Sequence, residues 1–173
     1  MLHLGLRDSA GFAPGNVYKF AQKRKPAWLP SCMQLLDGFV QNSGSEEQIN
    51  QHKKEVCAGS FVVAVEISAA CDFAQKKLQV ARLLPGLLIP DSLRKRVNSS
   101  ARFMKAIGPV FLETRAIPKN IYYLFFSSRQ VLSPEINRIL NLQPFAQLRG
   151  QGLADLQSWF SYQAGRQGIT LLK

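Results

Sequence analysis

Residues 61–67, with the sequence FVVAVEI, restrict the fold of this chain more than any other segment. The run is rich in β-branched residues, and in an extended conformation it presents apolar side chains on both sides. Such a pattern predicts a central strand that is buried on both faces of a sheet. Glu66 interrupts one of the two apolar faces near the end of the run.

The chain after this strand shows further helical and extended patterns. Asp91 is a good N-cap for a helix from Ser92 to about Ala106, which Gly108-Pro109 would stop. A late helix is expected from Pro144 or Phe145 to Gln163, with Gly165 as its C-cap. Further extended segments are expected at Leu78–Ile89 (kinked at Pro85-Gly86), Val110–Thr114, Ile121–Ser127 and Ile169–Leu172.

Residues 1–59 show weaker patterns. We expect a short basic helix over residues 17–25, a helix from Ser31 to Val40 with Ser31 as its N-cap, and a polar helix capped by Ser45. These helices are expected at the periphery of a core domain spanning residues 60–173, because a chain of 173 residues fits one domain better than two. The predicted fold class is α+β, with a small bent antiparallel sheet or partial barrel that a long C-terminal helix closes.

The charge balance points to an anionic partner. The chain has 22 lysines and arginines against 11 acidic residues, a net charge of +11. This excess favours nucleic acid or an acidic protein surface, with solubility as the alternative explanation. Tyr122 and Tyr123 would either stack on bases or belong to the core. The candidate nucleic-acid contacts lie on or near the predicted helix 92–106, and they are Arg94, Lys95, Arg96, Arg102 and Lys105.

A second candidate site lies where the predicted central strand ends. Glu66, Cys71 and Asp72 are close in sequence there, at a position where loops often present functional groups. Cys71 would act as a nucleophile or redox sensor if a cation, such as Lys76 or Lys77, stabilised its thiolate. The structural alternative is a small buried cysteine followed by an aspartate that caps a helical turn.

Arg149 is the candidate that would stabilise an anion in this second site. We expect it on the apolar stripe of the late helix, one turn before Leu153. An arginine on such a stripe needs a carboxylate partner, and Asp72 and Glu66 are the candidates. The two carboxylates alone are a weak magnesium pattern without a third ligand, so no metal site is predicted.

Several classes of site are absent from the sequence. Cys32, Cys57 and Cys71 form no C-x-x-C pair, and His3 and His52 are the only histidines, so zinc-finger spacing is missing. The odd cysteine count fits a reducing compartment, and we expect a cytoplasmic protein. The sequence has no apolar run long enough to span a bilayer, no clear signal peptide and no cofactor-binding motif, so neither membrane association nor a cofactor is predicted.

Two stretches resemble a known group of proteins. The first comprises residues 65–77 (VEISAACDFAQKK) and 82–90 (RLLPGLLIP), and the second comprises residues 144–149 (PFAQLR), 153–160 (LADLQSWF) and 166–168 (RQG). They resemble a loosely defined group of uncharacterised bacterial proteins. In that group a strand ends in a Ser-x-x-Cys-Asp motif, and a late helix begins near Leu-Arg and ends near Arg-x-Gly.

The resemblance covers roughly residues 60–170 and implies a fold. The barrel expected for the group is similar to the small SH3-like barrel of PemK/MazF-type toxins. This chain has Gln167 where the group's Arg-Pro-Gly would place proline, and Ala69 or Ala70 where a proline is expected before the cysteine. The group is loosely associated with receiver-like domains and defence contexts, and it transfers no activity.

Three hypotheses about function follow. The first is a non-enzymatic sensor or adaptor module of a bacterial stress or defence system that binds nucleic acid or a partner protein through its basic surface. The second is a ribonuclease-like or cysteine-dependent effector centred on Glu66, Cys71 and Asp72, with Arg149. The third is a structural subunit that needs another chain. The sequence leaves open whether the protein is an enzyme and what its oligomeric state is.

Overall fold

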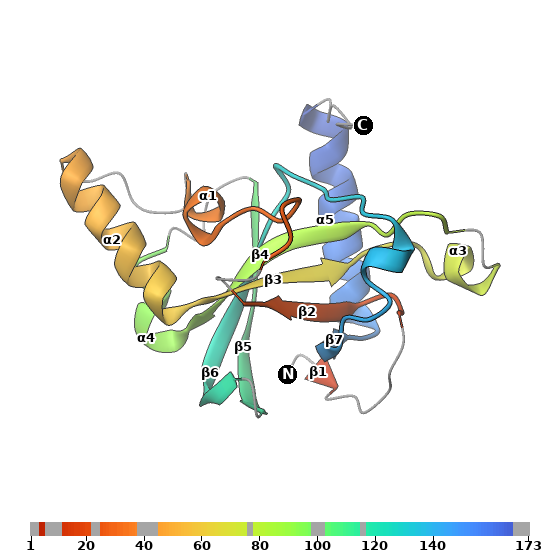
Figure 1. Cartoon of the computed structure of the whole chain (residues 1–173), viewed down its shortest axis with the longest axis horizontal. Coiled ribbons are helices and arrows are strands. Elements are labelled where there is room, and N and C mark those ends of the chain that lie inside the picture. Colours follow the sequence, from red (N-terminus) through yellow and green to blue (C-terminus); the bar gives the residue numbers. More distant parts are fainter. Residues whose placement is uncertain are drawn as a thin grey trace.

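We describe the protein from a computed structural model, in residues 4–5, 12–21, 25–37, 45–75, 78–97, 103–114 and 117–167. The fold is α+β, with a curled antiparallel sheet in which the strand order is β1-β7-β2-β3-β4-β6-β5 (Figure 1). The strands are β1 (Leu4–Gly5), β2 (Asn16–Phe20), β3 (Phe61–Glu66), β4 (Leu83–Pro90), β5 (Met104–Thr114), β6 (Ile117–Ser127) and β7 (Pro144–Leu148). The helices are α1 (Cys32–Leu36), α2 (Glu46–Gly59), α3 (Ala70–Ala74), α4 (Asp91–Arg94), the 3-10 helix η2 (Ile136–Arg138) and α5 (Gln151–Gln167).

The prediction of a central strand at residues 61–67 is confirmed. β3 lies between β2 and β4 and pairs antiparallel with both. Val62 and Ala64 belong to an apolar cluster on one face of the sheet, and Val63 and Val65 belong to a second cluster on the other face. All four side chains are at most 1% exposed. The spine of the sheet is therefore sealed between two layers of core.

Helices cover the two faces of the sheet separately. α1 and α2 contribute to the first cluster through residues such as Leu35 and Val56. α5 covers the second cluster, where Leu156 is fully buried and Trp159 packs at the margin. Figure 1 shows α5 crossing the sheet as one long helix, as expected for a closing C-terminal helix. The predicted α+β class with a bent antiparallel sheet is confirmed, and the SH3-like barrel stays an expectation.

The predicted helix from Ser92 to Ala106 is wrong. α4 ends at Arg94, and β5 begins at Met104 and pairs with β6 along most of its length. Pairing with the aromatic strand β6 buries Met104 and Ile107, and this tertiary gain outweighs a weak local helical preference. Gly108-Pro109 lies inside β5, at a register shift, instead of ending a helix.

Two other helix predictions also fail at their N-terminal parts. Residues 144–148 form strand β7, and α5 begins at Gln151 and continues past Gly165. Residues 17–20 belong to β2, because Val17 and its neighbours pair with β3 on one side and β7 on the other. In both places the sheet supplies backbone partners that the local sequence pattern does not reveal.

The predicted N-caps in the first third of the chain are confirmed. Ser31 and Ser45 each form a capping box, with Gln34 and Gln48 respectively. The division of the chain at residue 60 stays a prediction, and the expected strand 169–172 lies outside the described residues. Among the described helices, none has the length and apolar character needed to cross a bilayer.

Candidate functional sites at the end of strand β3 and on a basic face

Glu66 ends β3 as a fully buried carboxylate. Its Oε1 accepts hydrogen bonds from the backbone N–H groups of Ser68, at 2.8 Å, and Arg82, at 3.4 Å. Its Oε2 has no hydrogen-bond partner among the described residues. The Ser68 side chain is equally buried. Glu66 therefore holds the start of the β3–α3 connection in place and leaves one acceptor unsatisfied.

The surroundings of Glu66 favour its protonated form. Burial raises the pKa of Glu66, and hydrogen bonds from Ser68 and Arg82, together with the positive charge of Arg82, oppose that rise only in part. Tyr18 lies nearby, at 1% exposure. Its pKa is raised mainly by burial and further by the charge of Glu66, while a hydrogen bond with Asn16 lowers it. Below neutral pH this corner of the core carries less charge than its composition suggests.

Cys71 and Asp72 lie on the short helix α3. Cys71 is exposed, and its Sγ lies 3.8 Å from Asp72 Oδ1. The helix is anchored by Phe73, whose ring centroid is 4.7 Å from that of Phe12. No hydrogen bond or ion pair among the described residues connects Cys71 or Asp72 to Glu66, and Lys76 and Lys77 lie outside that part of the chain. An effector centred on Cys71 stays a prediction.

The expected burial of Arg149 against a carboxylate is wrong. Arg149 lies between β7 and α5 instead of on the stripe of the helix, and it is exposed. Its Nε donates to Gln147 Oε1 at 3.0 Å. Gln147 in turn donates from Nε2 to the Pro14 carbonyl at 2.9 Å. Arg149 therefore belongs to a polar contact at the β2–β7 edge, because the helix starts later than the sequence pattern suggests.

A pocket of about 330 Å³ lies between the end of β3 and α5. Gln157 connects its two sides, since its Nε2 donates to the carbonyls of Ile67, at 3.1 Å, and Ser68, at 3.3 Å. Sequence reasoning missed Gln157, because nothing in the helix pattern distinguishes it from a solvent-exposed glutamine. The described residues that line the pocket are Ile67, Ala69, Ala70, Arg82, Gln157, Phe160 and Ser161.

The predicted phosphate contacts are divided between two faces of the molecule. Arg94 and Lys95 are exposed at α4, on the side of the first core cluster. Arg96 forms an ion pair with Glu55 of α2. Lys105 pairs across the sheet with Phe126, which belongs to the second cluster. Because directly opposite residues of antiparallel strands share a face, Lys105 points to the opposite side from α4.

Arg102 completes the predicted set of contacts, and it lies outside the described residues. Tyr122 and Tyr123 are 3% and 9% exposed. The interpretation of these two rings as core residues is therefore the one that fits, and base stacking by them is excluded by burial.

Two exposed arginines stack on aromatic rings on the α4 side of the sheet. The Arg94 guanidinium carbon lies 4.4 Å from the centroid of the Tyr123 ring, and its NH1 donates to Tyr123 Oη at 3.3 Å. The Arg129 guanidinium carbon lies 3.5 Å from the centroid of the Phe103 ring. Both rings pack in or against the first core cluster. Sequence reasoning missed Arg129, since its ring partner is distant in sequence. We call Arg94, Lys95 and Arg129 the basic face.

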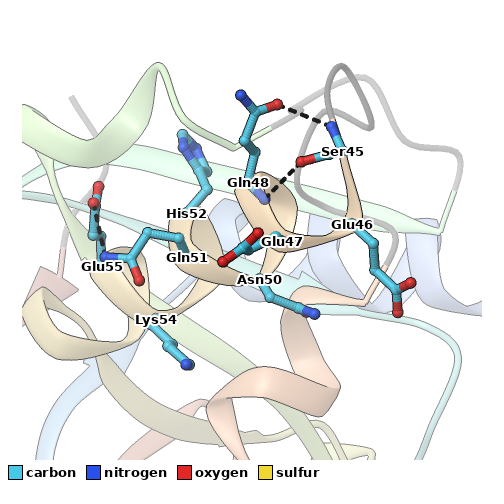
Figure 2. A pocket seen from close by; sticks show the side chains of 9 residues that line it. All are labelled: Ser45, Glu46, Glu47, Gln48, Asn50, Gln51, His52, Lys54 and Glu55. Carbon is cyan, nitrogen blue, oxygen red and sulfur yellow. Dashed lines mark hydrogen bonds between the residues drawn. The ribbon is translucent and has the colours of Figure 1, made fainter.

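The largest surface depression runs along α2 (Figure 2). All of its described lining side chains come from Ser45 and the helix that Ser45 caps, so the described residues supply only one wall. The side chains of Glu46 and Glu47 near the start of the helix give that end an acidic character. Such a surface provides no convergent set of groups for chemistry.

No known protein family matches this chain, and no curated protein or solved structure shows significant similarity to it. Within the described residues, no group of three or more His, Cys, Asp or Glu side chains has a geometry suited to a metal ion. The function is therefore inferred from the surfaces and contacts described above.

Proposed function

We propose that this protein is a non-catalytic module that binds nucleic acid by contacting phosphates with the basic face. The stacking of Arg94 on Tyr123 is the observation that carries the proposal. A stacked guanidinium is held in one orientation, so less conformational entropy is lost when its outer N–H groups bind a phosphate. One of the five N–H donors of Arg94 contacts Tyr123, which leaves the others for a ligand.

Arg129 supports the proposal from the same side of the sheet. Its guanidinium is fixed by the Phe103 ring and by a 3.0 Å hydrogen bond from NH1 to the Asp37 carbonyl. Arg94 and Arg129 therefore present two oriented guanidinium groups along β6, with Lys95 beside the first. A row of oriented cations on one face is suited to a chain of phosphates.

The charges of the basic face are not neutralised by described carboxylates. The ion pairs of the described residues join Lys53 to Asp37, Arg96 to Glu55, and Arg138 to Glu135, and none involves Arg94, Lys95 or Arg129. The whole chain retains a net charge of +11. Electrostatic attraction of a polyanion is the expected consequence.

The burial of Tyr122 and Tyr123 sets the kind of recognition. Because these two rings cannot stack on bases, affinity would come from the phosphate backbone, and little discrimination between sequences is expected. A role as an adaptor in a bacterial stress or defence system remains part of the proposal, and it rests on the resemblance of residues 60–170.

Fluorescence anisotropy with a labelled oligonucleotide of mixed sequence tests the proposal. For each phosphate that the double variant Arg94→Gln/Lys95→Gln no longer neutralises, its affinity at about 0.1 M salt should fall about tenfold, since one phosphate contributes about 0.9 logarithmic units relative to 1 M salt. The control is Arg138→Gln/Arg149→Gln, which removes the same charge from η2 and from the β7–α5 connection, away from α4 (Figure 1). An equal decrease of affinity in both double variants would contradict a localised basic face.

A further inference from the structure

Two of the three cysteines lie together between helices α1 and α2. Cys32, in the first turn of α1, is 6% exposed. Cys57, in the last turn of α2, is half-buried and packs against the same apolar cluster. The two side chains hydrogen bond to each other. None of the three cysteines forms a disulfide, and Cys71 lies apart on α3.

The environments of the paired thiols are different. The hydrogen bond from Cys32 lowers the pKa of Cys57, and the positive charge of Lys53 lowers it further, while burial opposes both effects. Lys53 lies one helical turn before Cys57 and also binds Asp37 at 2.7 Å. The contact with Cys57, followed by burial, raises the pKa of Cys32. Cys57 is thus the better nucleophile, and Cys32 is its protonated neighbour.

We propose that Cys32 and Cys57 form an oxidisable dithiol that closes to a disulfide between α1 and α2 on reaction with a low-molecular-weight disulfide such as oxidised glutathione. The proposal stands on the contact between the two thiols and on the accessibility of one of them. It is independent of nucleic-acid binding. In a reducing compartment such a pair would report on the redox state instead of serving as a permanent staple.

The reaction balances in two exchange steps. The Cys57 thiolate attacks one sulfur of oxidised glutathione and expels the other as glutathione thiolate, which leaves a mixed disulfide on Cys57. Cys32 then gives up its proton and attacks Cys57 Sγ, and the second glutathione thiolate leaves. Two protein thiols are oxidised by two electrons, and one oxidised glutathione is reduced to two glutathione molecules.

The test is to treat the reduced, folded protein with oxidised glutathione and to map the products by mass spectrometry after alkylation. The expected product contains a Cys32–Cys57 cross-link, about 2 Da lighter than the dithiol, and Cys71→Ser should form it at an unchanged rate. Cys32→Ala should stop at the mixed disulfide on Cys57, and Cys57→Ala should form no cross-link.

The wild-type map alone can overturn the proposal. If Cys71 reacts while Cys32 and Cys57 stay reduced, or if glutathione stays on Cys57 of the wild type without closure, the dithiol assignment is wrong. The map requires no variant, so a folding defect in either alanine variant does not affect this outcome.

Discussion

The buried carboxyl of Glu66 predicts an unusual dependence of stability on pH. Burial raises its pKa in the folded protein, whereas the unfolded chain has the ordinary value of about 4.3. Below about pH 4 both states bind the proton, and the favourable contribution of Glu66 is complete. As pH rises past that value, the unfolded chain releases its proton first, and the free energy of unfolding falls until pH passes the folded pKa.

Glu66→Gln isolates this effect, because glutamine resembles the protonated carboxyl and keeps an oxygen for the N–H groups of Ser68 and Arg82. Near pH 4 the variant should match the wild type within about 1 kcal/mol. Above pH 4 it should gain stability relative to the wild type, with a slope of at most about 1.4 kcal/mol per pH unit, since only one proton is involved.

Glu66→Ala gives the opposite test. It removes the acceptor of a buried backbone N–H, that of Ser68 at 2.8 Å. We expect a loss of about 1–3 kcal/mol relative to Glu66→Gln at every pH. Urea unfolding followed by circular dichroism between pH 4 and 8 measures all three proteins. A stability difference between Glu66→Gln and the wild type that does not change with pH would refute the reasoning.

Two further predictions concern packing, each with a control. Leu156→Ala should lower the free energy of unfolding by about 3 kcal/mol in urea denaturation, since the side chain is fully buried under α5, whereas Leu140→Ala, at 54% exposure, should change it by less than about 0.5 kcal/mol. Gly86→Ala should cost about 3 kcal/mol, because the new Cβ would lie 2.3 Å from the Phe125 carbonyl oxygen, while Gly165→Ala, with open space around it, should raise the thermal midpoint slightly by improving helix propensity. Equal effects of the members of either pair would contradict the described packing.

The sequence predicts those elements whose pattern is complete within a few residues. Residues 61–67 are apolar on both faces, and β3 is buried on both faces. Ser31 and Ser45 cap helices through partners three positions away, Gln34 and Gln48. These signals are local, and tertiary contacts reinforce them instead of opposing them.

The incorrect predictions occur where distant strands decide the structure. Residues 104–107 have a helix-compatible pattern, but β6 binds them as β5. Residues 144–148 look like the start of the late helix, but β2 pairs with them as β7. Backbone pairing of this kind depends on strands elsewhere in the sequence, so a window of ten residues does not contain the information.

The candidate sites show the same division. The burial of Glu66 at the end of β3 follows from the strand pattern, because the interrupted face is a core face. The stacking of Arg129 on Phe103 and the hydrogen bonds from Gln157 to the β3–α3 connection join positions far apart in the chain. Neither residue has a local signature, and only the folded arrangement identifies it.

The salt dependence of oligonucleotide binding tests the central claim, that the basic face binds phosphates, most directly. We expect the logarithm of the association constant to fall linearly with the logarithm of KCl concentration, with a slope of about −0.7 to −0.9 per phosphate contact. Arg94→Gln/Lys95→Gln should reduce the magnitude of that slope by about 1.5–2, one step for each cation removed. An affinity that does not vary with salt, or a slope that the double variant leaves unchanged, would contradict the account.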